Sequence, residues 1–575
     1  MRAFSIASVA AIMLLSAQPA AAAEAPRRPK KIFAHYMGCY PVAAAATAHH
    51  RANDAHKVRH DGGGKFDSFG DRWRNWALVP DGMNVDLEAS AELELRRAMR
   101  AGIDGFAVDA WAGGEGAKKV FAALLTVARE KDYPLEITIC TDPSCLPGEG
   151  GKADAIAEAI KWVIETFADN PKLARRDGKP LIIGYQSIWP GIDRAVAEFR
   201  KKPEFKDDDQ LWKNPKLRTS PEAWGCYIDA FKKIQEQVGT PIYQHFGMGA
   251  FFHPVYDAAS DDMKVAAAAK LAEFFPAVGE FLGGGEVYDR MAAAVRAKGA
   301  EWCEPMFFQY ENIGWGGNRI SKGADILRDR WEAARRNKST FIQFVTWNDY
   351  TENTCLAPAY ETRYAIFDLN RHFIEWWKTG KAPGSDRDKV YLLYRKYPRG
   401  ARIYPFKPKQ PDAGGVLEVL TILPAAATVR MPGRDAEWLA PAGMSYKQLA
   451  LTPGAVVAEV VRDGKVAVRL ESPEPITDRP FREQNGMTAY STEFQRQWKA
   501  DFPESQPILR GEYADADGDG LPNWFEMYWF GKFLDYSTAT AAKPEADPDG
   551  DGRTNLQEYL DQTDPTKADQ PRQGG

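Results

Sequence analysis

Two carboxylic acids three residues apart give the sequence its clearest chemical signal. Asp349 and Glu352 lie in the segment VTWNDYTEN, beside Trp347, Asn348 and Tyr350. Two carboxyl groups at this spacing can reach one cleft, where repulsion between their charges favours a proton on one of them. A protonated acid beside an ionised one can cleave a glycosidic bond, because the first protonates the leaving oxygen while the second helps to activate water. We therefore predict that Asp349 and Glu352 are catalytic.

Further polar and aromatic residues follow the other apolar segments of the first 350 positions, where each segment ends. In a barrel of parallel strands these ends meet on one face, so we expect their side chains to surround the same cleft. Polar groups there would bind sugar hydroxyls, and aromatic rings would stack on the apolar faces of sugars. The predicted substrate-binding residues are Asp109, Trp111, Trp189, His245, Glu286, Tyr310, Glu311, Trp347, Asn348 and Tyr350, and Asp142 ends a further segment.

A different arrangement of acids occurs near the end of the chain, where a twelve-residue pattern is present twice. Each copy has carboxylates at positions 1, 3, 5 and 12, glycine at position 6 and asparagine at position 9. A hard cation such as Ca²⁺ takes about six to eight oxygen ligands, and this spacing wraps the chain around it. We predict two structural Ca²⁺ sites and no cofactor for catalysis. The predicted ligands are Asp515, Asp517, Asp519 and Glu526 in the first loop and Asp547, Asp549, Asp551 and Glu558 in the second.

Predicted strands and helices alternate along residues 30–383, and they must position the predicted catalytic and substrate-binding residues. Near-continuous apolar runs, typical of parallel strands covered on both faces, are separated by amphipathic helical segments. Eight such alternations predict a (β/α)8 TIM barrel, and the absence of GxGxxG after the first strand disfavours an open doubly wound sheet. The predicted strands are 31–37, 102–111, 134–142, 179–187, 240–248, 279–287, 302–312 and 340–350, with helices over 154–169 and 326–338.

The pattern changes after the barrel. Short β-rich segments separated by turns predict a small β-sandwich over 384–475, and a connector with some amphipathic helix occupies 476–510. The calcium-binding repeats then fill 511–575. The predicted fold class is α/β: a (β/α)8 TIM barrel followed by a small β-sandwich and a calcium-binding tail.

Charge and targeting signals restrict the classes of function. The 575 residues carry a formal net charge of −5, and residues 511–575 hold 14 acidic and five basic side chains, so the acid is concentrated in the tail. The near balance elsewhere argues against a nucleic-acid-binding protein. Residues 1–23 combine Arg2, an apolar run and a small-residue end, which predicts a secretory signal peptide. No later stretch is long and apolar enough to predict a membrane span. We expect a secreted protein, extracellular, periplasmic or at the cell surface, whose partner is a polysaccharide and whose tail could attach it to a surface or matrix.

The chain has six cysteines, an even number for an exported protein. Cys39 follows the first predicted strand and Cys355 the eighth, and these strands are neighbours in a closed barrel. Cys140 and Cys145 flank a short turn. Both pairs are compatible with disulfide geometry, and we predict both disulfides beside the alternative of buried free thiols.

Three segments resemble a known family. AHYMGCY (34–40), GIDGFAVDAW (102–111) and above all VTWNDYTEN (345–353) look like glycoside hydrolase family 71, the α-1,3-glucanases or mutanases. The resemblance covers about residues 30–380 and, more loosely, the sandwich. It implies a (β/α)8 barrel followed by a β-sandwich and endo hydrolysis of 1,3-α-glucan with inversion, in which the motif acids, here Asp349 and Glu352, are catalytic. We assign Glu352 as the acid and Asp349 as the base. The tail lies outside this resemblance and is similar to thrombospondin type 3-like repeats.

The motif also leaves alternatives open. The family's WNDYGES reads WNDYTEN here, with Thr351 and Asn353 at the changed positions. A related family of endo-α-mannosidases carries a similar acid pair at the same place, so the pair identifies the clan better than the substrate. The alternatives are therefore an endo-α-mannosidase-type or other glycan hydrolase on the same barrel, and a non-catalytic surface glycan-binding protein that keeps it.

Overall fold

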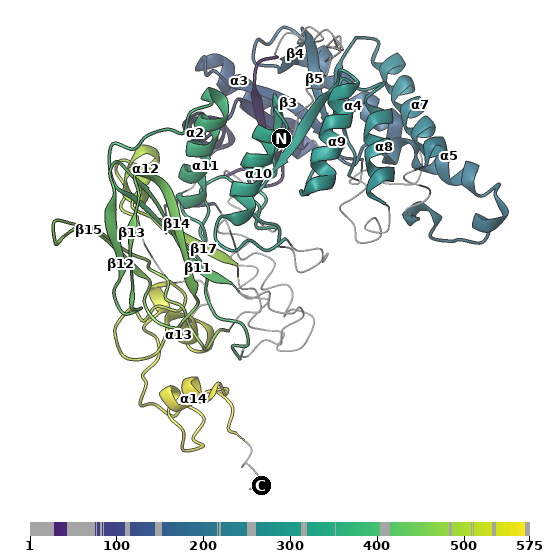
Figure 1. The fold of residues 1–575 in the computed structure, drawn as a ribbon. Coiled ribbons are helices and arrows are strands. Elements are labelled where there is room, and N and C mark those ends of the chain that lie inside the picture. Colours follow the sequence, from purple (N-terminus) through teal and green to yellow (C-terminus); the bar gives the residue numbers. More distant parts are fainter. Residues whose placement is uncertain are drawn as a thin grey trace, which may run out of the picture.

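The structure is a computed structural model in which a barrel, a β-sandwich and a tail follow one another along the chain (Figure 1). It describes residues 28–42, 75, 77–80, 83, 85–109, 115–143, 152–214, 217, 220–249, 260–311, 319–350, 352–402, 415–481, 486–507, 509, 511–531 and 536–569. Trp111 and Cys145 lie outside the described residues, so the predictions made for them stay predictions.

Eight parallel strands form a closed barrel, as predicted. Their spatial order is β3-β2-β1-β9-β8-β7-β6-β5, and β3 pairs with β5 to close the ring. A short β4 (Arg175–Arg176) pairs antiparallel with β5. The barrel strands are β1 (Lys31–Met37), β2 (Gly105–Asp109), β3 (Glu136–Thr141), β5 (Lys179–Gly184), β6 (Tyr243–Gly247), β7 (Ala277–Gly279), β8 (Glu301–Met306) and β9 (Phe341–Phe344).

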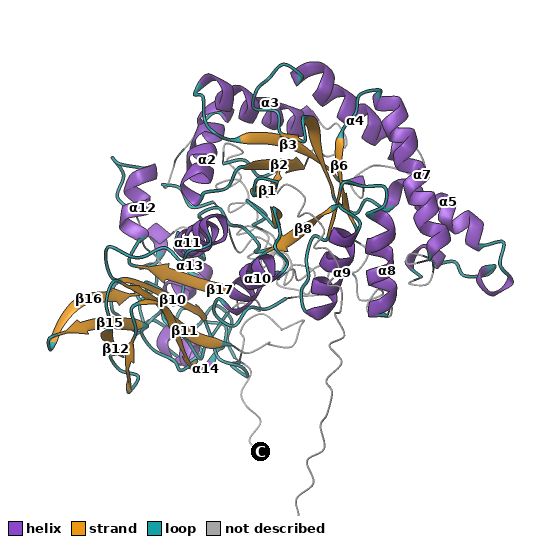
Figure 2. Cartoon of the chain, turned by 45° about the horizontal axis from the view of Figure 1, so that its top comes forward, coloured by secondary structure: helices purple, strands orange, loops and turns teal. Residues whose placement is uncertain are grey.

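Helices follow the barrel strands in the sequence and surround them on the outside (Figure 2). Local signals fix their ends: for the helix 87–101, Asp86 accepts a hydrogen bond from Ala89 N–H, and Gly102 ends it in the left-handed conformation. The helices are α2 (Leu87–Ala101), α3 (Glu115–Glu130), α4 (Lys152–Phe167), α5 (Trp189–Phe199), α7 (Pro221–Val238), α8 (Asp261–Leu271), α9 (Glu286–Ala297), α10 (Asp325–Arg336) and α11 (Ala365–Thr379).

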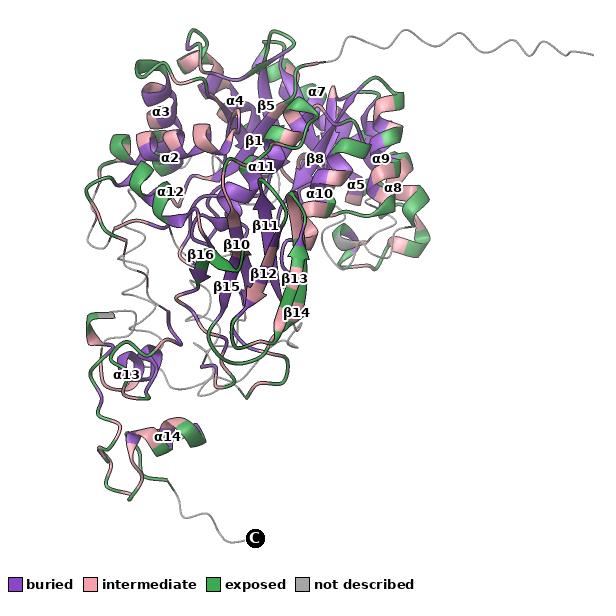
Figure 3. Ribbon diagram, turned by 60° about the vertical axis from the view of Figure 1, so that its left-hand side comes forward, coloured by how far each residue is buried: buried purple, intermediate pink, exposed green. Residues whose placement is uncertain are grey.

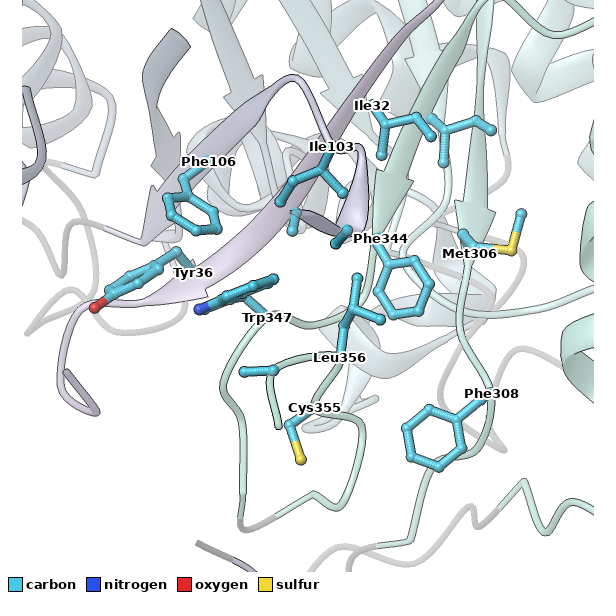
Figure 4. Packing of buried hydrophobic residues seen from close by; sticks show 14 of the residues in the cluster. Ile32, Tyr36, Ile103, Phe106, Met306, Phe308, Phe344, Trp347, Cys355 and Leu356 are labelled. Carbon is cyan, nitrogen blue, oxygen red and sulfur yellow. The ribbon is translucent and has the colours of Figure 1, made fainter. Parts of the chain in front are cut away.

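The barrel core lies between the strands and the helices, and the barrel strands are almost entirely buried (Figure 3). The residues after β9 return to this core: Figure 4 shows Trp347 and Leu356 beside Phe344, with Tyr36 and Phe106 close to the Trp347 ring. The Phe106 and Trp347 ring centroids are 5.0 Å apart. The segment that carries Asp349 therefore starts from a rigid, fully packed base.

Two four-stranded antiparallel sheets follow the barrel, with the orders β14-β11-β10-β17 and β13-β12-β15-β16. Residues 476–510, expected to be a connector with some amphipathic helix, contain that helix as α12 and also supply the strand β17, which pairs with β10. The elements are β10 (Lys389–Arg395), β11 (Val416–Leu423), β12 (Ala427–Met431), β13 (Ala436–Ala440), β14 (Gly443–Ala450), β15 (Val457–Arg462), β16 (Lys465–Glu471), β17 (Met487–Ser491) and α12 (Phe494–Asp501). Two short helices, α13 (Asn523–Trp529) and α14 (Asn555–Asp561), follow in the tail.

A buried ion-pair network joins α12 to the barrel. Asp501 at the end of α12 accepts hydrogen bonds from Arg97 Nε (2.7 Å) and the Tyr364 hydroxyl (2.5 Å), and it pairs with Arg100 Nη1 (2.6 Å). Arg97 and Asp501 are both buried. Removing one partner of such a pair strands a buried charge, so this network fixes the barrel and the segment after the sandwich together.

The structure corrects two expectations about the barrel. The strand predicted over 279–287 is shorter and earlier, because only Ala277–Gly279 pairs with its neighbours and Glu286 instead begins α9. The predicted Cys39–Cys355 disulfide is wrong: both cysteines are free thiols. Cys355 is buried in the core, where its sulfur lies 3.4 Å from the amide nitrogen of Asn75, while Cys39 stays near the surface of the barrel mouth. No helix in the described part of the chain combines the length and apolar character that a bilayer requires.

Candidate functional site

The carboxyl ends of β3, β2, β1 and β9 lie side by side and bring four acidic or basic side chains to one edge of the barrel. Asp109 is the last residue of β2, and Asp142 directly follows β3. His35 lies on β1 between β2 and β9, and its carbonyl accepts a hydrogen bond from Trp347 N–H just after β9. The strand order thus places Asp349, two residues further on, next to the β1 and β2 ends.

Asn348 fixes this arrangement. Its Oδ1 accepts a hydrogen bond from Met37 N–H (2.7 Å), and its Nδ2 donates to the carbonyls of Met37 (3.2 Å) and Tyr40 (3.0 Å). The side chain therefore replaces the strand partner that the end of β1 lacks. Asn348 was predicted to bind substrate, but it is fully buried and its hydrogen bonds hold the loop of Asp349 to β1.

Asp349 and Glu352 are held in one tight turn. The Asp349 amide donates to Thr346 Oγ1 (2.8 Å), and Asp349 Oδ1 accepts from the Glu352 amide (3.0 Å). Tyr310 donates its hydroxyl to Glu352 Oε1 (3.4 Å), and the amide of Glu311 donates to the Glu352 carbonyl (3.0 Å). Asp349 is buried while Glu352 is half-buried. The two acids therefore share one fixed turn but differ in access to solvent.

Asp109 is a third acid beside this pair. It is buried, and its Oδ2 lies 3.6 Å from His35 Nε2, within the range of an ion pair. Burial raises the pKa of Asp109 to about 6; His35 lowers it, whereas the charges of Asp142 and Asp349 raise it further. Asp142 and Asp349 therefore lie close enough for their charges to act on Asp109. A cluster of this kind retains a proton near neutral pH more readily than an isolated carboxylate.

Sequence reasoning missed a fourth buried acid on the same barrel face. Glu280 directly follows β7, and its Oε2 accepts a hydrogen bond from Gly249 N–H (3.1 Å). Burial raises the pKa of Glu280 to about 8, so the carboxyl is largely protonated at neutral pH. The signal was the apolar run before it, 275–279, which ends at Glu280. The predicted strand instead included the three glycines at 283–285 and ended too late in the sequence. The prediction therefore chose Glu286, which is exposed, as the residue at the strand end.

Aromatic side chains pack close to these acids at the barrel mouth. The Phe281 ring lies 4.4 Å from Tyr185 and 5.0 Å from His35, between ring centroids. Phe281 also belongs to one buried cluster with Tyr310, the donor to Glu352. The mouth of the barrel is thus lined by aromatic rings that restrict water around the acids, which strengthens charge interactions there.

The remaining predicted residues are distributed differently. His245 lies in the middle of β6, fully buried, and burial lowers its pKa to about 3, so it is a neutral core residue within the barrel. Trp347 and Tyr350 are buried in the packing beneath the loop. Glu311 is buried and pairs with Arg395 of β10 (3.4 Å). Trp189 is half-buried at the start of α5, where it contacts the more exposed Trp212 with 5.6 Å between ring centroids.

The acids of the tail have a different geometry. In each repeat, the first aspartate accepts hydrogen bonds from the amides three and five residues further on, at 2.7 and 2.8 Å from Asp515 and at 2.8 and 2.9 Å from Asp547. The glycines at position 6, Gly520 and Gly552, have φ values of 101° and 92°, which favour glycine. The two repeats of the tail thus adopt the same turn.

The donors of these loops fit a hard cation. The first three aspartates of each loop bring carboxylate oxygens within 4.8 Å of one another, and so do Asp551, Glu558 and Asp569. Glu526 and Glu558, at position 12, are buried, and Oε2 of each has no hydrogen-bond partner among the described residues. Burial raises the pKa of Glu526 to about 7. Buried carboxylate oxygens beside further carboxylates are the ligand set that Ca²⁺ prefers.

Comparison with known proteins adds one family match. Residues 298–501, which include Asp349 and Glu352, match the family model described as glycosyl hydrolase family 71. No curated protein is significantly similar to the chain.

Solved structures align with the chain at low identity and low TM-score. The GH99 endo-alpha-mannosidase from Bacteroides thetaiotaomicron has 12% sequence identity and a TM-score of 0.38, over 61% of this chain and 98% of that one. A glycoside hydrolase-like protein has 12% identity and a TM-score of 0.35, over 63% and 97% of the two chains. A glycosyl hydrolase family 2 member from Bacteroides cellulosilyticus has 9% identity and a TM-score of 0.34, over 67% and 43%. These scores are low, and the fold assignment depends on the closed barrel itself.

Proposed function

We propose that this glycoside hydrolase, matched to family 71 over residues 298–501, cleaves an α-glucan by endo hydrolysis of 1,3-α links with inversion. The observation that carries the proposal is the turn in which Asp349 Oδ1 accepts the Glu352 amide at the mouth of a closed barrel. It presents two carboxyl groups from one rigid segment inside the matched region.

The difference in burial supports separate roles for the two acids. Glu352 is the more exposed and accepts the Tyr310 hydroxyl, so it can reach a glycosidic oxygen and act as the general acid. Asp349 is buried between Asn348 and the β2 end, and an ionised carboxylate there helps to activate water as the base. Asp109 ends the neighbouring strand β2 and Asp142 follows β3, and in this proposal their carboxylates accept hydrogen bonds from sugar hydroxyls.

The experiment is the release of reducing sugar from a panel of insoluble polysaccharides. The proposal expects sugar release from 1,3-α-glucan. Because hydrolysis with inversion converts an α link into a β-configured reducing end, NMR spectra of the first products should show the β anomer. Activity only on α-mannan would instead select the endo-α-mannosidase alternative. Tight binding to glucan without release by the purified chain would select the glycan-binding alternative, against which the presence of both carboxylates argues.

We also propose that the tail holds two structural Ca²⁺ ions and that the protein is secreted. The buried glutamate oxygens and the matching turns of the two repeats support the first proposal. When bound, Ca²⁺ would supply charge neutralisation to the eight predicted ligands and take no part in catalysis. The apolar run in residues 1–23 supports the second proposal, which fractionation of cells expressing the full chain tests.

A further inference from the structure

The two tail loops differ at position 7, the residue that follows the invariant glycine. In the first loop this residue is Leu521, which is buried in an aromatic cluster with Trp524 and Phe525. In the second loop it is Arg553, whose Nε donates to Glu558 Oε1 (2.8 Å). The same turn therefore carries an apolar anchor in one loop and a cation in the other.

The pairing of Arg553 involves the most important ligand of the second loop. Glu558 is at position 12, where a carboxylate binds Ca²⁺ through both oxygens. One of these oxygens already accepts the guanidinium, and only Oε2 has no partner among the described residues. In the first loop the corresponding Glu526 accepts only an amide, that of Ala542 (3.1 Å), and no described cation pairs with it. Ca²⁺ must therefore compete with a cationic guanidinium for the glutamate of the second loop, but only with an uncharged backbone amide for that of the first.

Arg553 also has other partners that would hold it after release. Its guanidinium pairs with Asp561 on α14 and lies 3.7 Å from Asp569 Oδ2. Asp569 in turn donates its amide to Asp551 Oδ2 (2.9 Å), so the second site extends beyond the twelve-residue loop. Losing Glu558 would leave Arg553 paired, which makes the displacement possible at moderate cost.

We infer that the two loops bind Ca²⁺ unequally, because the ion pair between Arg553 and Glu558 competes with Ca²⁺ and weakens the second site relative to the first. We call this ion pair the latch. This inference rests on the proposed Ca²⁺ binding by the tail. It predicts stepwise loading: the first loop fills at a lower Ca²⁺ concentration, and the second fills when Ca²⁺ competes with the latch.

The test is calorimetric titration of the full chain, freed of metal, with CaCl₂. The wild type should show two events, of which Glu526→Gln removes the tighter and Glu558→Gln the weaker. Arg553→Gln should tighten the weaker event about tenfold, since a hydrogen bond to a charged group is worth roughly 1.5–3 kcal/mol and this one is partly exposed. Circular dichroism and thermal unfolding of each variant show that it is folded.

A matched control separates the latch from simple loss of charge. Lys543→Gln removes the same charge from the tail, and the Lys543 ammonium makes no ion pair with the described residues. It should change the weaker event by about twofold at most, because an exposed charge acts only through screened attraction. A single event in the wild type that becomes two in Arg553→Gln would also support the latch. Two equal events, unchanged by Arg553→Gln or changed as much by Lys543→Gln, would overturn it. No binding by any variant at millimolar Ca²⁺ would instead overturn the calcium proposal itself.

Discussion

The acids of the barrel mouth and those of the tail loops are both clustered, but they are held by opposite means. At the barrel mouth, Asp109 and Asp349 are buried on a fully packed base, and burial raises the pKa of Asp109 to about 6. In the tail, Asp515 and Asp547 are exposed, and local backbone amides shape their loops. A buried carboxyl that gains or loses a proton suits acid–base chemistry, whereas ionised carboxylates around a turn suit a cation. Burial therefore distinguishes the barrel acids from the first aspartate of each tail loop, whereas the glutamates at position 12 of the loops are buried as the barrel acids are.

The largest expected effect concerns the barrel pair. Asp349→Asn and Glu352→Gln should each lower kcat by about 10²–10⁴-fold while the protein stays folded, because each removes one proton-transfer group. Reducing-sugar release and thermal unfolding measure the two quantities. Near-wild-type turnover by either variant would show that this acid is not catalytic. The proposed difference in function between the barrel acids and the tail acids would then lose its support.

Asp109 provides a sharper comparison within a single strand. Asp109→Asn should lower kcat/KM by roughly 10–100-fold, since a hydrogen bond between a charged group and a sugar hydroxyl is worth about 1.5–3 kcal/mol. Asp104, just before the other end of β2, is the matched control: it accepts the Ile32 amide (2.8 Å) and pairs with Lys378 (2.7 Å), away from the barrel mouth. Asp104→Asn should reduce stability and leave kcat/KM nearly unchanged. Equal losses of activity in both variants would mean that β2 acts only as a scaffold.

The sequence is sufficient to predict the barrel, because strand and helix periodicities repeat eight times and each repeat supports the next. The strand predicted over 31–37 is identical to β1, since a largely apolar run there is preceded by basic residues and followed by Gly38. The strand order then follows from the fold, and it places Asp109 and Asp349 on either side of β1 at the same barrel end.

Features that depend on tertiary contacts could not be predicted in this way. Only three residues of β7 pair, so the local pattern did not distinguish its end from the glycine run that follows, and Glu280 was missed. β17 lies some 60 residues after β11 and completes its sheet through β10, a pairing that no local pattern encodes. Burial likewise decides which predicted residues line the cleft: His245 has a suitable side chain but lies inside the barrel.

Glu280 allows a pH test of the buried cluster. Because burial raises its pKa to about 8 in the folded chain, its contribution to stability is fully present below about pH 4, its unfolded range, and is lost as pH rises through about 8. The free energy of unfolding of the wild type should therefore fall between about pH 5 and pH 9, whereas that of Glu280→Gln, which cannot ionise, should not. The difference between the two proteins should change by a few kcal/mol across this range in favour of the variant. Denaturant unfolding at both pH values measures this difference. Parallel pH profiles for the two proteins would show that Glu280 is ionised in the folded state.

The smallest expected effect on activity is that of Ca²⁺ removal, although the tail and barrel are in contact. Lys396 pairs with Glu361 (2.8 Å), in the segment after the turn of Asp349 and Glu352, and with Glu512 (3.3 Å), at the start of the tail. Glu474 also accepts the amides of Glu512 (2.7 Å) and Tyr513 (2.9 Å). All of these contacts precede Asp515, the first predicted ligand, so they should persist when the loops lose their cations.

Chelation with EDTA should therefore leave kcat within about twofold while it lowers the stability of the tail. A ligand that binds only the folded form at a hundred times its Kd contributes about 2.7 kcal/mol, which should appear as a lower unfolding temperature and as faster proteolysis after the sandwich. The activity assay and limited proteolysis are run on the same metal-free sample, with Ca²⁺ added back as the control. Lost turnover that Ca²⁺ restores would show that the Lys396 contacts transmit the state of the loops to the turn of Asp349 and Glu352, and the two acid clusters would then form one coupled system.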